Sequence, residues 1–573
     1  MTSKGNHGGE AIVQAFRQLG IEYVFSSPGS EWAPVWEAFA SQEVEKRAGP
    51  AFLNCGHETL AVDLAIGYSA ITGRMQAVML HAGSGLLQGS MGINAARMTA
   101  TPMVVLSGES LTYGDRADFD PGAQWYGLLG VVGGPQRLVE PLVKWGNQAT
   151  SPETLYDMVI RAGEIALRTP AGPTYLNVPL ETMLAPWAPR SNLRAVPYPP
   201  KPRPADADID RVARMLAESA SPLIVTDSAG REPEGYAALM ELAELLAIPV
   251  IESPVATVSS FPKEHPLHQG FDIDPVLETA DLVLLVRSRI PWYPPGASPK
   301  HARVVVLDEQ PFKTWMVYQN LHGDDYLEGD VPSTLRLLSA VIRGSGTADA
   351  GAAARSKIEA RRAQLAASHR KMQDANRAAV AKARLASGLS ALDVCATLAE
   401  VLPENATYLD ETTMHRSLNV RHVGYRGPHS FFRVPSGLGQ CLGFGLGIKL
   451  ASPERTVVCL VGDGSLLYNP VLPALGFARE HKLPLLVIVF NNHGYRCMSA
   501  NHRSFYPQGV AAKHDLFVGE TLTGLDYAEL AKPFGGVGFR VRSAKELRPA
   551  LEQARDAVRD GRIAIVNAEL QNG

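Results

Sequence analysis

The sequence predicts an α/β protein built from three consecutive parallel-sheet α/β domains. Short runs rich in Val, Ile and Leu alternate with longer helical patterns along nearly all of the 573 residues. This alternation is typical of parallel strands joined by crossover helices. A proline-rich stretch at 198–204 and a Gly-Ser-Gly stretch at 344–346 read as linkers. We therefore expect domains at residues 1–190, 205–343 and 356–573.

The elements of each domain follow from the same patterns. In the first domain we expect helices at 9–19 and 58–72 and strands at 23–25, 76–80, 103–107 and 174–178. In the second we expect strands at 222–226, 249–252, 282–286 and 303–307, without a GxGxxG fingerprint. In the third we expect a charged helix at 355–384, strands at 456–461 and 483–490, and a helix at 470–481 between them.

Composition narrows the classes of function. The net charge of -4 gives no electrostatic case for binding nucleic acid or an anionic membrane. The first residues lack the apolar core of a signal sequence, and no stretch is apolar enough to span a membrane. The five cysteines show neither paired nor metal-ligand spacing. We therefore expect a cytoplasmic protein with reduced, buried thiols.

Residues that could bind a ligand are concentrated at the ends of two neighbouring strands of the third domain. One strand leads into Gly462-Asp463-Gly464-Ser465, and the next ends at Asn491-Asn492-His493-Gly494-Tyr495. Parallel strands end at one edge of the sheet, where ligands bind, so Asp463 and Asn492 can meet. Carboxylate, amide and backbone oxygens suit Mg²⁺ or Ca²⁺ carrying a diphosphate. The alternative is an ordinary βαβ unit with turn glycines.

This pair of segments resembles the cofactor-binding motif of thiamine-diphosphate enzymes, GDG followed some thirty residues later by NN. The resemblance implies thiamine diphosphate and Mg²⁺ as cofactors. It assigns the metal to Asp463, Asn492 and the carbonyl of Gly494. It assigns the cofactor to a larger set: Thr412, Thr413, Leu442, Gly464, Ser465, Asn492, Gly494 and Tyr495, together with Glu58.

Glu58 lies in the first domain, where a strand gives way to a helix. The segment His57-Glu58, followed by Gly67-Tyr68 and Thr72-Gly73, resembles the "HE…GYA..TG" segment of the same enzymes. There the glutamate binds the aminopyrimidine ring and activates the cofactor. The alternative is a helix-start acid stabilised by the helix dipole. In this family the pyrimidine and diphosphate sites of one cofactor come from different subunits, so the resemblance implies a homodimer or homotetramer.

Two departures from the family pattern stand beside the site. The stretch 436–445 resembles the glycine-rich turn that precedes GDG, in which Leu442 corresponds to the bulky residue beneath the cofactor. Gln440 is an extra residue in that turn, and Asn469-Pro470 reads as an insertion after GDGS.

Several segments look most like benzoylformate decarboxylases: 27–30, 80–85, 141–145 and 408–413. That resemblance gives Ser30 the substrate carboxylate and His81 a proton-relay role, for which a histidine is suited. The alternative for His81 is a strand-end residue satisfied by backbone. A second histidine expected in the central domain is missing from 287–292, and His415, His422, His493 or His502 could substitute.

We therefore expect a thiamine-diphosphate-dependent lyase or carboligase acting on a 2-oxo acid or related ketone. Protonation after C–C cleavage would make it a decarboxylase, whereas attack on a second carbonyl would make it a carboligase. The alternatives are an acetolactate-synthase-like transferase, a 2-hydroxyacyl-CoA lyase, and a non-catalytic homologue, which the intact Glu58 and GDGS…NN residues oppose. The central domain could hold a flavin or a nucleotide.

Overall fold

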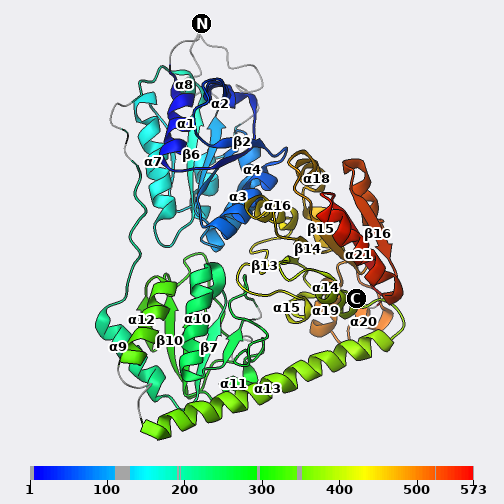
Figure 1. Cartoon of the computed structure of the whole chain (residues 1–573). Coiled ribbons are helices and arrows are strands. Elements are labelled where there is room, and N and C mark those ends of the chain that lie inside the picture. The colour runs from blue at the N-terminus through cyan, green and yellow to red at the C-terminus, as the bar shows by residue number, and fades with distance from the viewer. Residues whose placement is uncertain are drawn as a thin grey trace.

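The computed structural model describes residues 6–109, 130–189, 193, 195–253, 255–292, 297–344, 351–522 and 524–571. Within these ranges the chain forms three parallel sheets, one after another along the sequence, with helices on their faces (Figure 1). This confirms the predicted fold class. The exact domain boundaries remain predictions, and the second linker, at 345–350, lies outside the described residues.

The first sheet has the strand order β2-β1-β3-β4-β6-β5. Its central strand β3 is buried along its whole length, as expected for a strand covered by helices on both faces. The elements of this unit, in order, are α1 (Gly8–Gln18), β1 (Tyr23–Ser27), η1 (Ser30–Trp32), α2 (Ala33–Val44), β2 (Ala51–Asn54), α3 (Glu58–Thr72), β3 (Gln76–Leu80), α4 (Ser84–Met98), β4 (Met103–Glu109), α6 (Pro135–Val139), η2 (Glu140–Leu142), β5 (Gly146–Gln148), α7 (Pro152–Leu167), β6 (Pro173–Pro179) and α8 (Leu180–Leu184).

The second sheet has the order β11-β10-β9-β7-β8. Its predicted strands are confirmed to within one residue at each end. The elements are α9 (Asp206–Glu218), β7 (Pro222–Thr226), η3 (Ala229–Arg231), α10 (Pro233–Leu246), β8 (Val250–Glu252), α11 (Asp274–Leu277), β9 (Leu282–Val286), β10 (Arg303–Asp308), β11 (Asp325–Glu328), α12 (Val331–Gly344) and the long helix α13 (Gly351–Leu385).

The third sheet has the order β13-β12-β14-β15-β17-β16. One short helix, α17, starts at Asp463 itself, where the sequence predicts only a turn. The elements are α14 (Ala391–Val401), β12 (Thr407–Glu411), α15 (Arg416–His422), β13 (Phe431–Arg433), α16 (Cys441–Ala451), β14 (Val457–Gly462), α17 (Asp463–Tyr468), α18 (Val471–Glu480), β15 (Leu486–Asn491), α19 (Arg496–Phe505), α20 (Val510–His514), η4 (Tyr527–Phe534), β16 (Val537–Val541), α21 (Ala544–Arg559) and β17 (Ala564–Glu569).

The first and third sheets share one hydrophobic core through helices α3 and α16, which lie side by side (Figure 1). Glycines allow the two backbones to approach closely. A Cβ on Gly67 would lie 2.1 Å from the Phe444 carbonyl oxygen, and a Cβ on Gly447 would lie 2.2 Å from that of Leu64. The helix that begins with Glu58 is therefore held directly against the third domain.

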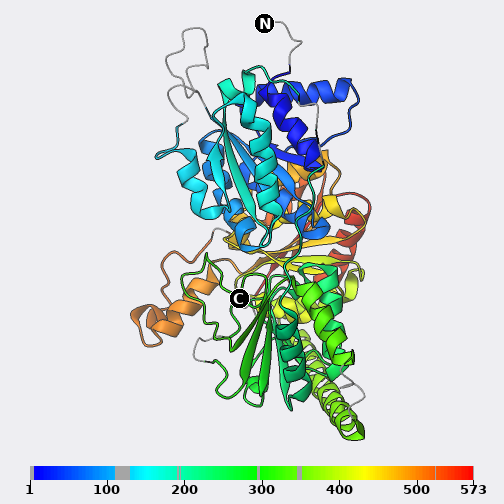
Figure 2. The same cartoon turned by 90° about the vertical axis from the view of Figure 1, so that its left-hand side faces the viewer.

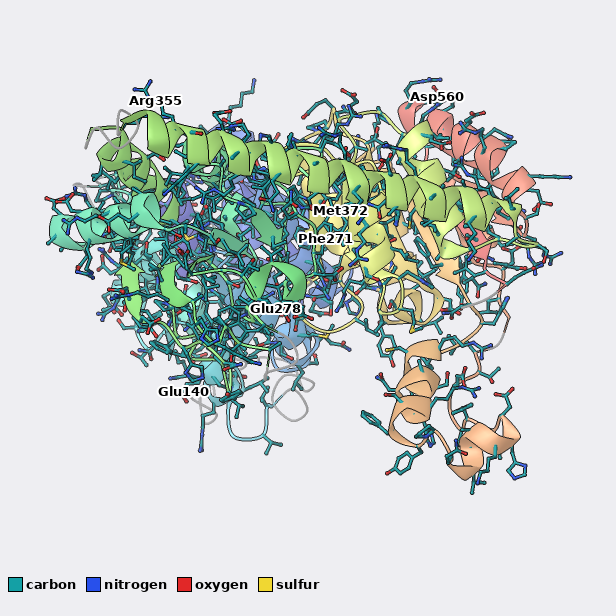
Figure 3. The ribbon with its side chains drawn as sticks, turned by 90° about the horizontal axis from the view of Figure 1, so that it is seen from below. Glu140, Phe271, Glu278, Arg355, Met372 and Asp560 are labelled. Carbon is teal, nitrogen blue, oxygen red and sulfur yellow. The ribbon has the colours of Figure 1, made fainter. Side chains whose placement is uncertain are left out.

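Two features extend from this body. Helix α13, with Arg355 near one end and Met372 near its middle, runs along the underside of the second and third units (Figure 3). It is bound to the second unit by bonds such as His369 Nδ1 to the His268 carbonyl, 2.8 Å. Helices α19 and α20 project from the third unit as an arm (Figure 2).

The cysteines and the helices agree with the expectations from composition. All five cysteines fall within the described ranges and are free thiols, of which only Cys497 is not fully buried. Among the helices of the described residues, none is both long and apolar enough to cross a membrane.

Candidate active site

The first half of the site lies at the carboxyl ends of β1 and β3. His81 follows β3 directly, and its Nδ1 lies 3.0 Å from Oε1 of Glu31. The same carboxylate oxygen accepts the Ala82 amide at 2.9 Å, and the Glu31 side chain is fully buried. The hydrogen bond to Glu31 raises the pKa of His81, although partial burial opposes it. Because a carboxylate accepts, Nδ1 carries the hydrogen and Nε2 is the nitrogen that can exchange a proton with a ligand.

Glycines bring His81 together with Glu58 and Ser30. A Cβ on Gly85 would lie 2.8 Å from the His81 Cβ and 3.0 Å from Oε1 of Glu58. A Cβ on Gly29, which precedes Ser30, would overlap the His81 ring at 1.8 Å from Nδ1. The three first-domain residues that the sequence singles out thus lie around one loop cluster, and any side chain at either glycine would push them apart.

Helix α3 starts at Glu58 for local reasons. The side chain of His57 caps the helix by accepting the Thr59 amide at 3.2 Å, and Gly73 ends it in the left-handed conformation, at φ 66°. An acid in the first turn is stabilised by the helix dipole. Glu58 is thus fixed in the first turn, and it is half-buried against α4.

The second half of the site lies at the carboxyl ends of β14 and β15. Both oxygens of the Asp463 carboxylate accept backbone amides, Oδ1 from Gly464 at 2.9 Å and Oδ2 from Gly494 at 3.0 Å. Burial raises the pKa of Asp463, while these bonds lower it. The structure therefore brings together the GDG and NN segments, as predicted from their positions at neighbouring strand ends.

Asn492 has a buried amide oxygen that is suited to bind a ligand. Its Oδ1 is buried and has no hydrogen-bond partner among the described residues. A buried amide oxygen without a donor is costly, so such an atom calls for an ion or another ligand. The Tyr495 ring lies close to Gly464, where an added Cβ would approach it to 2.6 Å. Asp463 and Asn492 are hard oxygen donors of the kind that Mg²⁺ takes.

The remaining predicted site residues of the third domain differ in burial and in hydrogen-bond partners. Thr412 is buried and donates through Oγ1 to Asp410 at 2.7 Å, whereas Thr413 is exposed. Ser465 is buried in α17, and its carbonyl accepts Nδ2 of Asn469 at 3.0 Å. Leu442 is buried in the core shared by α3 and α16.

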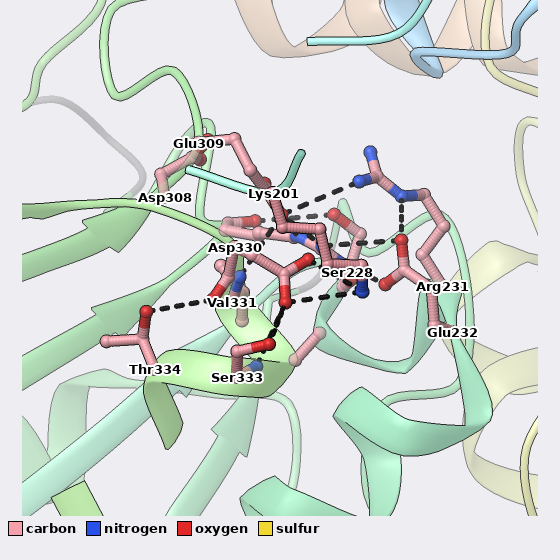
Figure 4. Close-up of polar contacts among 12 residues, drawn as sticks. Lys201, Ser228, Arg231, Glu232, Asp308, Glu309, Asp330, Val331, Ser333 and Thr334 are labelled. Carbon is pink, nitrogen blue, oxygen red and sulfur yellow. Dashed lines mark hydrogen bonds and ion pairs between the residues drawn. The ribbon is translucent and has the colours of Figure 1, made fainter. Parts of the chain in front are cut away.

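A separate cavity of about 580 Å³ lies where the strands of the second sheet end, bounded also by the ends of α3 and α4. Several of its basic groups are engaged by carboxylates (Figure 4). Arg287 binds Glu232 and Glu309, and Lys313 binds Asp308 at 2.8 Å. Although burial opposes it, the charge of Arg287 lowers the pKa of Glu309 to about 2. These cations are thus already neutralised by the protein's own acids.

Glu31 is the functional residue that sequence reasoning missed. Its one local signal is its place directly after Ser30 in the loop Pro28-Gly29-Ser30. Nothing in the local pattern links it to His81, fifty residues further along the chain. A buried acid is recognised as a partner only when the sheet brings β1 beside β3.

Comparison with known protein families shows to which family the chain belongs. Three family models match in chain order: the N-terminal TPP binding domain of thiamine pyrophosphate enzymes at residues 6–124, their central domain at 209–338, and their C-terminal TPP binding domain at 411–568. The chain belongs to the thiamine pyrophosphate enzyme family. It is therefore a thiamine-diphosphate-dependent enzyme of the decarboxylase and carboligase group.

Individual members of the thiamine pyrophosphate enzyme family match along nearly their whole length. Benzoylformate decarboxylase of Pseudomonas aeruginosa is 27% identical, covering 95% of this chain and 96% of that protein. The acetolactate synthase large subunit of Haemophilus influenzae is 23% identical, covering 96% and 92%. The structure of a thiamine diphosphate-dependent 4-hydroxybenzoylformate decarboxylase from Rhodococcus jostii RHA1 superposes with a TM-score of 0.80 at 22% identity, covering 99% of each chain.

Proposed function

We propose that this family member is a thiamine-diphosphate- and Mg²⁺-dependent lyase that cleaves the C–C bond beside the carbonyl of a 2-oxo acid. The observation that carries the proposal is the placement of both Glu58 and the His81–Glu31 pair next to Gly85. Such a site has one acid for the cofactor and one proton relay for the substrate. The similarity to benzoylformate decarboxylase over 95% of the chain supports this assignment.

Each half-site has its own task in this proposal. When bound, thiamine diphosphate supplies the nucleophilic carbon and the electron sink of the reaction. Glu58 holds a proton at N1′ of the aminopyrimidine, His81 exchanges a proton with the substrate through Nε2, and Ser30 binds the substrate carboxylate. Glu31 keeps the His81 ring in the tautomer that leaves Nε2 for this exchange.

The third domain would hold the metal and the diphosphate. Asp463, the orphaned Oδ1 of Asn492 and the carbonyl of Gly494 form the metal set, which fits the hard oxygen donors that Mg²⁺ prefers. The diphosphate and ring contacts fall to the other predicted residues: Thr412, Thr413, Leu442, Gly464, Ser465 and Tyr495.

We further propose that the working enzyme is a homodimer or homotetramer whose sites are shared between copies. Large apolar side chains are exposed beside the diphosphate half-site and on the projecting arm (Figure 2): Leu467, Tyr468, Leu472, Met498, Phe505, Tyr506, Val510, Leu516 and Val518. Exposed apolar surface of this kind marks a protein–protein contact. The five free thiols support a reducing compartment such as the cytoplasm.

The test is product analysis. The holoenzyme is supplied with a panel of 2-oxo acids, aliphatic and aromatic, each with and without an aldehyde acceptor, and products are identified by NMR. Release of CO₂ and an aldehyde identifies a decarboxylase, whereas a 2-hydroxyketone identifies a carboligase. Binding of both cofactors with no consumption of any 2-oxo acid would overturn the proposed substrate class.

A further inference from the structure

A second polar cluster lies between the two half-sites, deep in the contact of α3 with α16. Its first member, Asp63, is on the same helix as Glu58 and has no solvent exposure. Helices α4 and α16 enclose it: a Cβ on Gly92 would lie 3.3 Å from its Oδ1, and a Cβ on Gly443 would lie 2.6 Å from its Cβ. A carboxyl group in such surroundings needs either a cation or a proton.

No cation takes that role among the described residues. The hydrogen bond of Asp63 comes from a neutral amide: Nε2 of Gln440 donates to Oδ1 at 3.0 Å. Two buried acceptors then remain without a partner in the described part of the chain, Oδ2 of Asp63 and Oε1 of the same Gln440. An ionised Asp63 would leave both of them unsatisfied.

One proton on Oδ2 of Asp63 would satisfy both atoms. If Oδ2 carries a hydrogen, it can donate to Oε1 of Gln440 while Nε2 donates to Oδ1. This closes the two-bond ring that a carboxylic acid forms with a primary amide, with one donor and one acceptor on each side. Burial, and then the nearby charge of Glu411, raise the pKa of Asp63 well above its usual range, in agreement with this geometry.

Glu411 is the second acid of the cluster. Its carboxylate accepts the amides of Gly439, Gln440 and Cys441 and Nδ2 of Asn469, at 2.5 to 3.3 Å. Burial raises the pKa of Glu411 to about 7, although its four hydrogen-bond donors favour the charged form. Gln440 thus joins the two acids, through its backbone to Glu411 and through its side chain to Asp63.

The cluster also reaches the diphosphate loop. Asn469 donates to the Ser465 carbonyl at 3.0 Å, and its Oδ1 accepts the Leu442 amide at 3.0 Å. Gln440, and Asn469 with Pro470 after it, are the places at which the sequence departs from the family pattern. The departures therefore belong to one polar connection that runs from the Glu58 helix to the loop after Asp463.

We propose that Asp63 is protonated in the folded enzyme, pairs with Gln440 as an acid–amide ring, and is a positioning residue. It fixes the Glu58 helix against the third domain of the same chain, so that the two half-sites which this chain contributes to different shared sites keep their relative position. The positioning of Glu58 rests on the proposed function, whereas the protonation of Asp63 does not. The other titratable group that faces this site is Glu411, with the thiol of Cys441 beside it.

The first experiment measures the proton directly. Infrared difference spectra of the purified enzyme at pH 7, wild type minus Asp63→Asn, should contain the C=O band of a protonated carboxyl. Asp393→Asn is the matched control, because Asp393 is equally buried but accepts the backbone N–H and hydroxyl of Ser390. A difference spectrum with carboxylate bands alone would overturn the proposal.

The second experiment measures how the melting temperature depends on pH. A folded pKa above the unfolded value gives stability that is full at low pH and is lost as pH rises. The melting temperature of wild type should therefore fall relative to that of Asp63→Asn as pH rises above about 4, the ordinary value of an aspartic acid, since the asparagine keeps both ring bonds and never ionises. Parallel curves for the two proteins would contradict a protonated Asp63.

The third experiment tests positioning. Asp63→Asn should retain turnover, whereas Gln440→Met, which removes both ring bonds, should lower kcat by up to about a hundredfold with KM and cofactor affinity little changed. Equal kcat in Gln440→Met and wild type would remove the positioning role. If wild type converts no 2-oxo acid, the proposed function fails, while the infrared and pH experiments still decide the protonation of Asp63.

Discussion

Nδ1 of His81 lies 3.0 Å from the fully buried carboxylate of Glu31, which also accepts the amide that follows His81. The pair fixes the ring orientation and raises the histidine's pKa. We expect Glu31→Gln to shift the limb of the pH–kcat profile that reports His81 toward lower pH, because the variant lacks the charge that favours the imidazolium. The exposed Glu37→Gln on α2 is the control. If this limb of the pH–kcat profile has the same position in Glu31→Gln as in wild type, Glu31 has no role in catalysis.

The same pair makes a prediction for stability. The pKa of His81 is raised in the folded protein, so the pair stabilises the fold most fully below the ordinary histidine value and loses this effect as pH rises through the raised value. The melting temperature of wild type should exceed that of Glu31→Gln most at acidic pH.

His81→Ala should lose turnover by about a hundred- to ten-thousand-fold while it still binds cofactor.

Glu58 should control cofactor activation rather than folding. Glu58→Gln keeps the size and a hydrogen bond but cannot transfer the proton. We expect the variant to melt like wild type and bind thiamine diphosphate, but to exchange the cofactor's C2 proton slowly, as followed by NMR in deuterated buffer. Exchange at the wild-type rate would exclude Glu58 from this role.

Metal binding should depend on Asp463. Ligand at a hundredfold excess over Kd stabilises a fold by about 2.7 kcal/mol. Thiamine diphosphate with Mg²⁺ should therefore raise the melting temperature of wild type, and EDTA should reverse the rise. Asp463→Ala should show no rise, and Asn492→Ala a reduced one. A full rise in Asp463→Ala would remove this residue from the site.

The oligomer makes a prediction about mixed subunits. If each site takes Glu58 from one copy and Asp463 from another, Glu58→Gln and Asp463→Ala subunits should together form some intact sites. We expect two inactive preparations to regain up to about a quarter to a half of wild-type activity after subunit exchange, depending on how the subunits pair. Mass spectrometry checks that hybrids form, and hybrids without activity would indicate sites made within one chain.

The sequence alone was enough to predict the fold class and most of the helices and strands. Helix α3 and strands β3, β7 and β9 have the predicted bounds, because apolar periodicity, β-branched runs and turn glycines are local signals. It was also enough to predict that Asp463 and Gly494 lie close together, since parallel strands end at one edge of a sheet. The resemblance to thiamine-diphosphate enzymes, carried by GDGS and NN, is confirmed by the family models.

Only the tertiary structure decided which distant side chains pair. Glu31 and His81 are 50 residues apart, and Asp63 and Gln440 are 377 apart. No periodicity predicts such pairs, because they depend on how two sheets and two glycine-lined helices pack. The sequence presents Gln440 as an insertion in a turn. Packing makes it the hydrogen-bond partner of a buried acid, since a carboxyl removed from water must find either a donor or a proton.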